Sequence, residues 1–277
     1  MNQNVVYDIG MSNGDDTAYY LSLGYNVVAV EAIPDLVRKA EKRFKQFIES
    51  GRLKIVNVGI AENEGRVNFY VNKYDSGWSS FHLHLANRGN IGYDVVAIET
   101  KSLNQVISEY GNPYYVKVDI EGYDMVALNS LFACEEKPMF LSVELFDLNG
   151  IQLLQQLGYK KFKIIDQQSL LPLELPESVE YSTFNRLNVF KSSKNFFLRV
   201  VRKIFGPFII NKMEKKFKRN FKYSHTLGTS GPFGDDGFGI WHSFDEIQII
   251  YQDYKSRFEQ TSGGKEFGWW IDLHATL

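Results

Sequence analysis

Short apolar runs alternate with helical patterns from residue 5 to about residue 190 of this chain, and this alternation constrains the fold more than any other feature. The first runs, at residues 5–9 and 25–33, are separated by helical sequence, and a long amphipathic segment at 34–50 opens with Pro34, which suits the first turn of a helix. Strands that alternate with helices form a mostly parallel sheet, because each helix carries the chain back to where the next strand begins. The sequence therefore predicts an α/β fold.

One stretch departs from this alternation. Asn63 to Gly65 separate two apolar runs within residues 59–72, and this pattern predicts a hairpin in place of a helix that crosses between parallel strands. A polar loop at 73–90 follows the second run.

The composition is that of a globular protein in a reducing compartment. Hydrophobic residues make up 44% of the chain and aromatic residues 15%, enough to bury a core. A single cysteine, Cys134, excludes a disulfide within the chain, and no cluster of cysteines offers a zinc site. The first ten residues carry no basic or apolar signal, and no run of about 18 apolar residues occurs. We expect a cytoplasmic protein, with peripheral attachment to a membrane as an alternative.

The first strand ends in a glycine loop, within the sequence VVYDIGMSNGDDTAYYLSLG at residues 5–24. Asp8, Gly10 and Gly14 follow the form DxGxxxG, and a strand that breaks at glycine and restarts as a helix leaves backbone NH groups open to a ligand. The dinucleotide pattern GxGxxG is absent. An acid at position 8 would repel a pyrophosphate but would attract a cationic amino-acid group. S-adenosylmethionine, which has an ammonium group, a sulfonium group and no phosphate, fits this loop better than a dinucleotide.

A second acid supports a cofactor site. Glu31 ends the second strand about 20 residues further on, where a carboxylate accepts hydrogen bonds from the ribose hydroxyls of an adenosine. By position, residues 57–59 at the end of the third strand should lie against the adenine. The alternative is a plain tight turn with no ligand. The predicted cofactor-binding residues are Asp8, Gly10, Ser12, Asn13, Gly14, Glu31, Ala32, Asn57, Val58, Gly59, Ser80 and Asp119.

Acidic residues gather in KVDIEGYD, at residues 117–124 after another apolar strand. Carboxyl ends of strands in open α/β sheets are where ligands bind, so Asp119 and Glu121 should face the same crevice as the glycine loop. Asp124 is expected to stabilise the start of the following helix instead. In the loop SGWSSF, Ser79 and Ser80 are candidate hydrogen-bond donors and Trp78 a candidate wall, although an ordinary surface loop explains them equally well.

These segments occur in an order that resembles the FkbM family of S-adenosylmethionine-dependent methyltransferases. The resemblance covers about residues 4–190, and its most specific part is KVDIEG at this distance from the glycine loop. It implies a Rossmann-like, seven-stranded class I methyltransferase sheet. It also implies methyl transfer to a hydroxyl oxygen, typically on a sugar or a natural product.

A sugar hydroxyl is a weak nucleophile, so such an enzyme needs a base that removes its proton as the new bond forms. Asp119 is the first candidate, with Glu121 beside it. His82 and His84, two residues apart on what we expect to be a strand, are alternatives, although such a pair also occurs without a catalytic role. A further alternative is that Asp119, Glu121 and Glu144 hold a divalent cation such as Mg²⁺, which would acidify the hydroxyl.

Beyond residue 190 the chain changes character. Residues 191–222, called the basic segment below, contain eleven Lys or Arg and one Glu, a charge of +10; the whole chain carries −2, so the remainder carries −12. Gly206 and Pro207 are expected to divide the segment into two amphipathic helices. We therefore predict a methyltransferase domain at 1–190 and a basic, helical and aromatic-rich appendage at 191–277. The basic segment either packs on its own domain or binds an anionic membrane surface or an acidic glycan.

The sequence thus predicts an O-methyltransferase that uses S-adenosylmethionine and acts on a hydroxyl of a sugar, glycan or glycosylated metabolite. Two alternatives remain. One is a degenerate cofactor-binding scaffold that recruits a partner through the basic segment. The other is a nucleic-acid methyltransferase, which is disfavoured because the chain has no (N/D)PP(Y/F) run.

Overall fold

The computed structural model describes residues 2–145, 147–167, 170–176, 190, 195–218, 223–226, 228–237, 239–262 and 270–277. These form two compact units. The first unit comprises Met1–Glu144, Gln152–Tyr159 and Thr276–Leu277, and the second comprises Leu145–Ile151 and Lys160–Ala275. The predicted domain boundary at residue 190 adjoins residues outside this description and stays a prediction.

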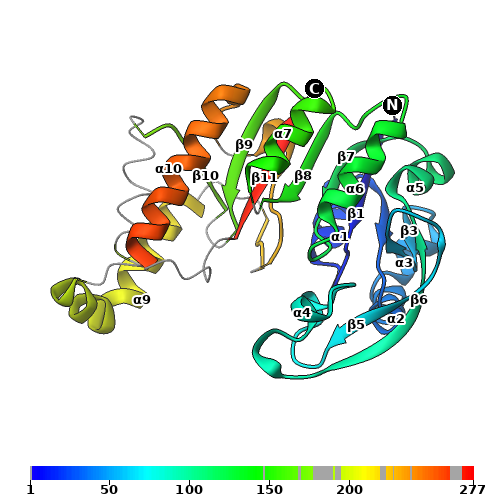
Figure 1. The fold of residues 1–277 in the computed structure, drawn as a ribbon, viewed down its shortest axis with the longest axis horizontal. Coiled ribbons are helices and arrows are strands. Elements are labelled where there is room, and N and C mark those ends of the chain that lie inside the picture. Colours follow the sequence, from blue (N-terminus) through cyan, green and yellow to red (C-terminus); the bar gives the residue numbers. More distant parts are fainter. Residues whose placement is uncertain are drawn as a thin grey trace. The chain divides into compact units, whose positions relative to one another are not determined.

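The first unit is built on parallel strands in the order β8-β7-β1-β2-β3 (Figure 1). Their bounds are β1 (Asn2–Ile9), β2 (Asn26–Val30), β3 (Leu53–Val56), β7 (Pro113–Val118) and β8 (Phe140–Glu144). The chain adds β2 and β3 on one side of β1 and then β7 and β8 on the other, and all four neighbouring pairs are parallel. The order therefore reverses between β1 and β7, where Rossmann-like sheets bind their ligands. The predicted α/β fold is confirmed.

Helices lie between successive strands along the chain. They are α1 (Asp15–Ser22), α2 (Pro34–Arg43), α3 (Lys45–Glu49), α5 (Leu103–Tyr110), α6 (Asp124–Ser130) and α7 (Leu148–Gln156), with a 3-10 turn η3 (Leu131–Ala133). Pro34 opens α2 as predicted, and Val37 and Ala40 on that helix are buried. The strands β1, β2 and β7 read as near-continuous apolar runs because helices cover both faces of a parallel sheet, and Tyr7, Ala29 and Val116 are completely buried.

A second, three-stranded sheet belongs to the same unit and has the order β4-β6-β5, with β4 (Gly59–Ile60), β5 (Gly65–Asn72) and β6 (Tyr93–Lys101). The predicted hairpin between the runs at 59–60 and 65–72 is wrong, because β6 lies between them, parallel to β4 and antiparallel to β5. A two-residue strand offers too few backbone groups to hold an eight-residue one, whereas β6 matches β5 along its whole length. The segment between β5 and β6 carries η1 (Ser76–Trp78), α4 (Leu83–Ala86) and η2 (Arg88–Asn90).

The second unit contains β9 (Lys161–Asp166), β10 (Leu171–Leu173) and most of β11 (Ile271–Thr276), in the order β10-β9-β11. Its helices are α9 (Phe196–Lys218) and α10 (Phe244–Ser262), with a 3-10 turn η4 (Gly234–Asp236). Ser243 and Glu246 exchange hydrogen bonds at the start of α10, a capping box that satisfies backbone NH groups there.

Two expectations for the C-terminal part of the chain are corrected. The predicted break at Gly206 and Pro207 is wrong, since α9 is one helix that runs through both residues. A proline removes one backbone hydrogen bond from a helix, and a long helix can continue past that loss. The second correction concerns residues 271–276, which form a fully buried strand where the sequence indicated only an aromatic tail. The last of the apolar runs that were expected to alternate with helices, near residue 190, lies almost wholly outside the described residues.

Candidate functional site

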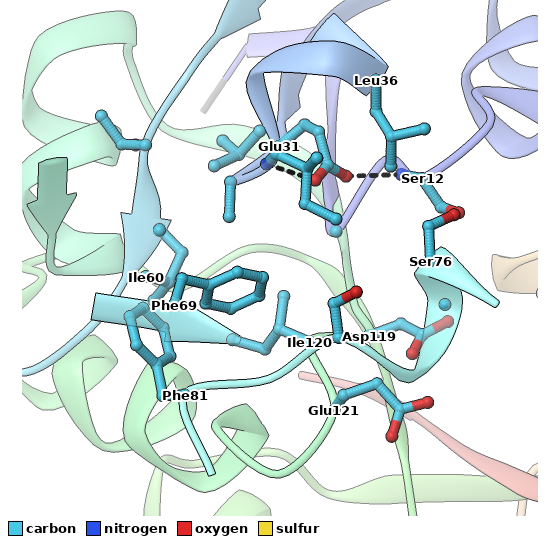
Figure 2. Close-up of a pocket in the computed structure, with 18 residues that line it drawn as sticks. Ser12, Glu31, Leu36, Ile60, Phe69, Ser76, Phe81, Asp119, Ile120 and Glu121 are labelled. Carbon is cyan, nitrogen blue, oxygen red and sulfur yellow. Dashed lines mark hydrogen bonds between the residues drawn. The ribbon is translucent and has the colours of Figure 1, made fainter. Parts of the chain in front are cut away.

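A pocket opens in the first unit at the carboxyl ends of β1, β2 and β7, the place where the strand order reverses (Figure 2). The glycine loop contributes Gly10 and Ser12 to its lining, and the loop after β7 contributes Asp119 and Glu121. Residues near β4 and η1 complete the walls. The two sequence motifs predicted to share a crevice therefore do so.

Gly10 permits this close approach of β1 and β7. Its backbone adopts a φ of 85°, in the left-handed region, and a Cβ at this position would lie 1.9 Å from the backbone oxygen of Asp119. The NH groups of Gly10 and Met11 both donate to the carbonyl oxygen of Val30, at 3.0 Å, which ties the loop to β2. Only glycine combines this conformation with this spacing.

Glu31 lies at the end of β2, and its side chain is 6% exposed. One carboxylate oxygen accepts a hydrogen bond from the NH of Ser12 and the other from the NH of Ile33, both at 2.8 Å (Figure 2). Burial raises the pKa of this carboxyl to about 7, and the two backbone NH groups act in the opposite direction. Glu31 lines the pocket, and each of its oxygens can accept one more hydrogen bond, so the carboxylate can still accept the hydroxyls of a ribose.

An apolar wall adjoins Glu31. It consists of Ile33, Leu36, Val58, Ile60, Phe69 and Phe81. The rings of Phe69 and Phe81 pack edge to face, with centroids 4.9 Å apart, and Figure 2 places both beside Ile60. Such a surface suits the flat face of an adenine. Sequence reasoning placed residues 57–59 here but missed Phe81, for which the SGWSSF loop gave the only signal.

Asp119 and Glu121 stand on a tight turn after β7. The carboxylate of Asp124 accepts hydrogen bonds from the NH of Ile120 at 3.0 Å and of Gly122 at 3.1 Å. Asp124 thus stabilises the turn from the first residue of α6, near its predicted role at the helix start. Glu121 has a φ of 48°, in the left-handed region that is uncommon for a residue other than glycine.

Glu121 forms an ion pair with Arg88. Burial raises the pKa of the Glu121 carboxyl to about 7, Arg88 lowers it, and the charge of Asp119 raises it. The guanidinium of Arg88 also lies over the ring of Trp78, 5.6 Å from its centroid. Trp78 is not among the lining residues, so its predicted role as a wall has no support in this geometry; it contacts Arg88, the partner of Glu121.

A buried lysine, which sequence reasoning missed, links the two loops of the pocket. Lys117 on β7 is 3% exposed, and its ammonium lies 3.4 Å from Asp8, 3.4 Å from Asp16 and 3.6 Å from Asp119. It also donates to the carbonyl oxygen of Gly10 at 3.2 Å. Through these contacts the ammonium of Lys117 links β1, the glycine loop, α1 and the end of β7.

Asp8 is therefore placed behind the pocket rather than in its lining. Its side chain is completely buried, one oxygen faces Lys117 and the other accepts a hydrogen bond from the hydroxyl of Thr17 at 2.6 Å. The direct cofactor contact predicted for Asp8 has no support in this geometry. Its charge can act on a bound cation only through the space between them.

The remaining predicted cofactor residues fall into two groups. Ala32, Val58 and Gly59 line the pocket. Asn13, Gly14, Asn57 and Ser80 are not among the lining residues, and Asn13 and Asn57 are exposed to solvent. Asn57 donates to the carbonyl oxygens of Glu31 and Ala32, and Ser80 donates to that of Glu121 at 2.7 Å.

His82 and His84 do not lie on a strand, so that prediction is wrong. His82 directly precedes α4 and His84 lies within it, because the carbonyl of His82 accepts the NH of Ala86 in a helical turn. Both side chains are exposed and outside the pocket lining, with ring centroids 5.5 Å apart. The geometry gives no support to either as the base.

The predicted metal ligands Asp119, Glu121 and Glu144 do not form a metal site. In the part of the chain that the structure describes, no group of three or more His, Cys, Asp or Glu side chains is arranged to hold an ion. Glu121 is instead engaged by Arg88.

The charge of the pocket distinguishes between cofactors. Among the described residues that line it are three carboxylates, Glu31, Asp119 and Glu121, and no lysine or arginine. Such a lining disfavours a pyrophosphate and favours a ligand with positive groups, since opposite charges attract most strongly away from water. With the apolar wall and a ribose acceptor at Glu31, the residues fit S-adenosylmethionine.

Comparisons with known proteins agree with this fit. The model of the methyltransferase FkbM domain matches residues 8–161, more than half of the chain. No curated protein is similar enough to count as a match. Within the described part of the chain, no helix has the length and apolar character needed to cross a bilayer.

Solved structures of methyltransferases resemble the chain only distantly. The FkbM methyltransferase from Methylobacillus flagellatus has 18% identity and a TM-score of 0.42, over 58% of this chain and 40% of its own length. A precorrin-6Y C5,15-methyltransferase from Geobacter metallireducens has 13% identity and a TM-score of 0.33, over 59% of this chain and 67% of its own. Phosphoethanolamine N-methyltransferase 2 from Haemonchus contortus, solved with S-adenosyl-L-methionine, has 10% identity and a TM-score of 0.36, over 99% of this chain and 48% of its own length.

The family match runs from the end of β1 to the start of β9, and so includes every residue that lines the pocket. The chain belongs to the FkbM family of methyltransferases, and the strand order at which its pocket opens is that of a Rossmann-like sheet.

Proposed function

We propose that the protein uses S-adenosylmethionine to methylate a hydroxyl oxygen of a sugar, glycan or glycosylated metabolite. The observation that carries the proposal is the position of Asp119, a partly exposed carboxylate that lines the pocket at the end of β7, across from Gly10 and Glu31. When bound, S-adenosylmethionine supplies a methyl group on a positively charged sulfur. A carboxylate beside the acceptor is what a hydroxyl needs in order to react at neutral pH.

The role of Asp119 is to accept a proton. Gly10, Ser12 and Glu31 would hold S-adenosylmethionine, which would supply the methyl group that the acceptor oxygen takes and would leave as a neutral sulfide. The hydroxyl proton then passes to the carboxylate of Asp119. Lys117, 3.6 Å from that carboxylate, holds it at the edge of the pocket.

Carbohydrate as the acceptor class is supported by the segment between β5 and β6. Ser76 and Gly77 of η1 line the pocket, and the neighbouring aromatic rings of Tyr74 and Trp78 have centroids 6.2 Å apart. Tyr74 is exposed. Sugar rings stack their CH faces on such rings, while serine hydroxyls and the Arg88 guanidinium can bind sugar hydroxyls.

A transfer assay tests the proposal. The purified enzyme is incubated with methyl-labelled S-adenosylmethionine and a panel of free glycans, lipid-linked sugars, glycosylated metabolites and nucleic acids. We expect label on a carbohydrate hydroxyl, and Trp78→Ala should raise the KM for that acceptor while cofactor affinity stays unchanged. Asp94→Asn on exposed β6 is the matched control and should behave as wild type. Label on nucleic acid alone would contradict the proposal.

A further inference from the structure

Helix α9 presents a row of large apolar side chains to solvent. Phe196, Val200, Ile204 and Phe208 recur every four residues and are 81%, 40%, 63% and 70% exposed. Because 3.6 residues make one turn, residues four apart form a continuous row along a helix. Phe197 and Phe205, also exposed, belong to the next row, so the two rows form one apolar face.

The other side of α9 faces its own unit. Arg202 donates from its guanidinium to the carbonyl oxygen of Phe190 at 3.0 Å, and Gly206, one turn further on, is buried. Leu198, one turn before Arg202, lies on this side too and is partly buried. The helix therefore already has a packed side, and the exposed apolar face is a separate surface.

Cationic residues border the apolar face. Arg199 and Lys203 are exposed, lie one turn apart and are neighbours of Phe196 and Val200 on the helix surface. They belong to the basic segment, which has a charge of +10 in sequence. The side chains of residues 210–222 lie outside the described part of the chain, so the face is defined here by residues 196–209.

We propose that α9 binds an anionic lipid surface through this face. A helix with aromatic and aliphatic residues on one face and Lys or Arg at its border inserts the apolar face at the level of the lipid headgroups, and the cations contact the anionic headgroups. Charge complementarity favours lipid over a second copy of the chain. A symmetric contact through the same face would bring two basic segments together.

Flotation with lipid vesicles tests the proposal. Full-length protein is mixed with vesicles of phosphatidylcholine, or of phosphatidylcholine with phosphatidylglycerol, at low and high salt. We expect flotation with the anionic vesicles only, and less of it at high salt. In Arg199→Gln/Lys203→Gln the loss of two charges should weaken partitioning roughly 30-fold, about 2 kcal/mol. Ile204→Gln/Phe208→Gln should abolish it, since the apolar contact is lost.

Matched controls are Lys45→Gln on α3 and Ile249→Gln on α10, which change exposed residues of the same types elsewhere. Both should float as wild type does, and all variants should keep the wild-type unfolding temperature. Equal flotation with the two vesicle types, or none with either, overturns the proposal. So does light scattering that shows a wild-type dimer which Ile204→Gln/Phe208→Gln converts to a monomer, because the face then binds a second copy.

Discussion

Glu31 should make cofactor binding depend on pH. Its carboxyl is buried and has a pKa raised to about 7 by that burial. In its ionised form the carboxylate can accept one hydroxyl at each oxygen, because the NH groups of Ser12 and Ile33 each occupy only one lone pair of an oxygen. In its protonated form one oxygen of the carboxyl group carries the hydrogen and can accept fewer hydrogen bonds. Ribose binding therefore favours the ionised form, and binding below pH 7 should release a proton.

The size of the effect follows from the pKa. About one tenth of the Glu31 carboxyl is ionised at pH 6 and about nine tenths at pH 8, if its pKa is about 7. If only the ionised form binds the ribose, affinity for S-adenosylmethionine at pH 6 should be roughly tenfold lower than at pH 8. A tenfold change corresponds to about 1.4 kcal/mol.

Titration calorimetry of S-adenosylmethionine binding measures both the affinity and the number of protons released. It is carried out at pH 6 and pH 8, in two buffers that differ in their heat of ionisation. Glu31→Gln should bind more weakly at both pH values and lose the difference between them, because the amide does not titrate. It also leaves a backbone NH without its acceptor, at a cost of about 1–3 kcal/mol.

Two further variants identify the titrating group. Glu121 lines the same pocket and also has a pKa raised to about 7 by burial, so Glu121→Gln must retain the pH dependence if Glu31 is its source. Glu49→Gln, at an exposed site on α3, should match wild type. Equal wild-type affinity at both pH values without proton release would refute the reasoning. The same pH dependence in Glu31→Gln would assign it to another group.

Three other changes have defined outcomes. Gly10→Ala should lower the free energy of unfolding by more than about 2 kcal/mol, since its Cβ would meet the Asp119 oxygen. Gly24→Ala, at a site with an equally positive φ and open space, should lower it by only about 1–2 kcal/mol. Equal denaturation midpoints for the two variants would contradict the steric argument. Asp119→Asn should bind cofactor normally by calorimetry and lose about a hundredfold to ten-thousandfold in turnover, and normal turnover would show that the base lies elsewhere. Lys117→Met should lower the free energy of unfolding, measured in urea, by about 3–5 kcal/mol, because it leaves buried carboxylates next to one another. The double variant with Asp8→Asn should regain part of that free energy. A double variant no more stable than Lys117→Met would contradict the ion pair.

Features set by local sequence could be predicted. The parallel strands, the glycine loop and Glu31 at the end of β2 all follow from apolar runs that end at glycine or acid. Features set by distant pairing could not. The alternation in residues 82–85 resembles a strand, yet α4 forms because backbone groups there bond within the segment. The strand β11 contains the buried polar residues Asp272 and His274, which do not suggest a strand in the sequence, and the strands beside it come from much earlier in the chain.

Lys117 was missed for a related reason, and the strand register explains its place. A lysine in a sequence suggests the surface, because unpaired lysines are rarely buried. In the parallel pair of β1 and β7, however, Asp8 lies opposite Lys117 and Ile9 opposite Val118. Side chains two residues apart share a face of a sheet, so this register brings Gly10 to Asp119 just past the ion pair. The same register that neutralises Lys117 therefore aligns the glycine turn with the candidate base, and a shift of one residue would lose both.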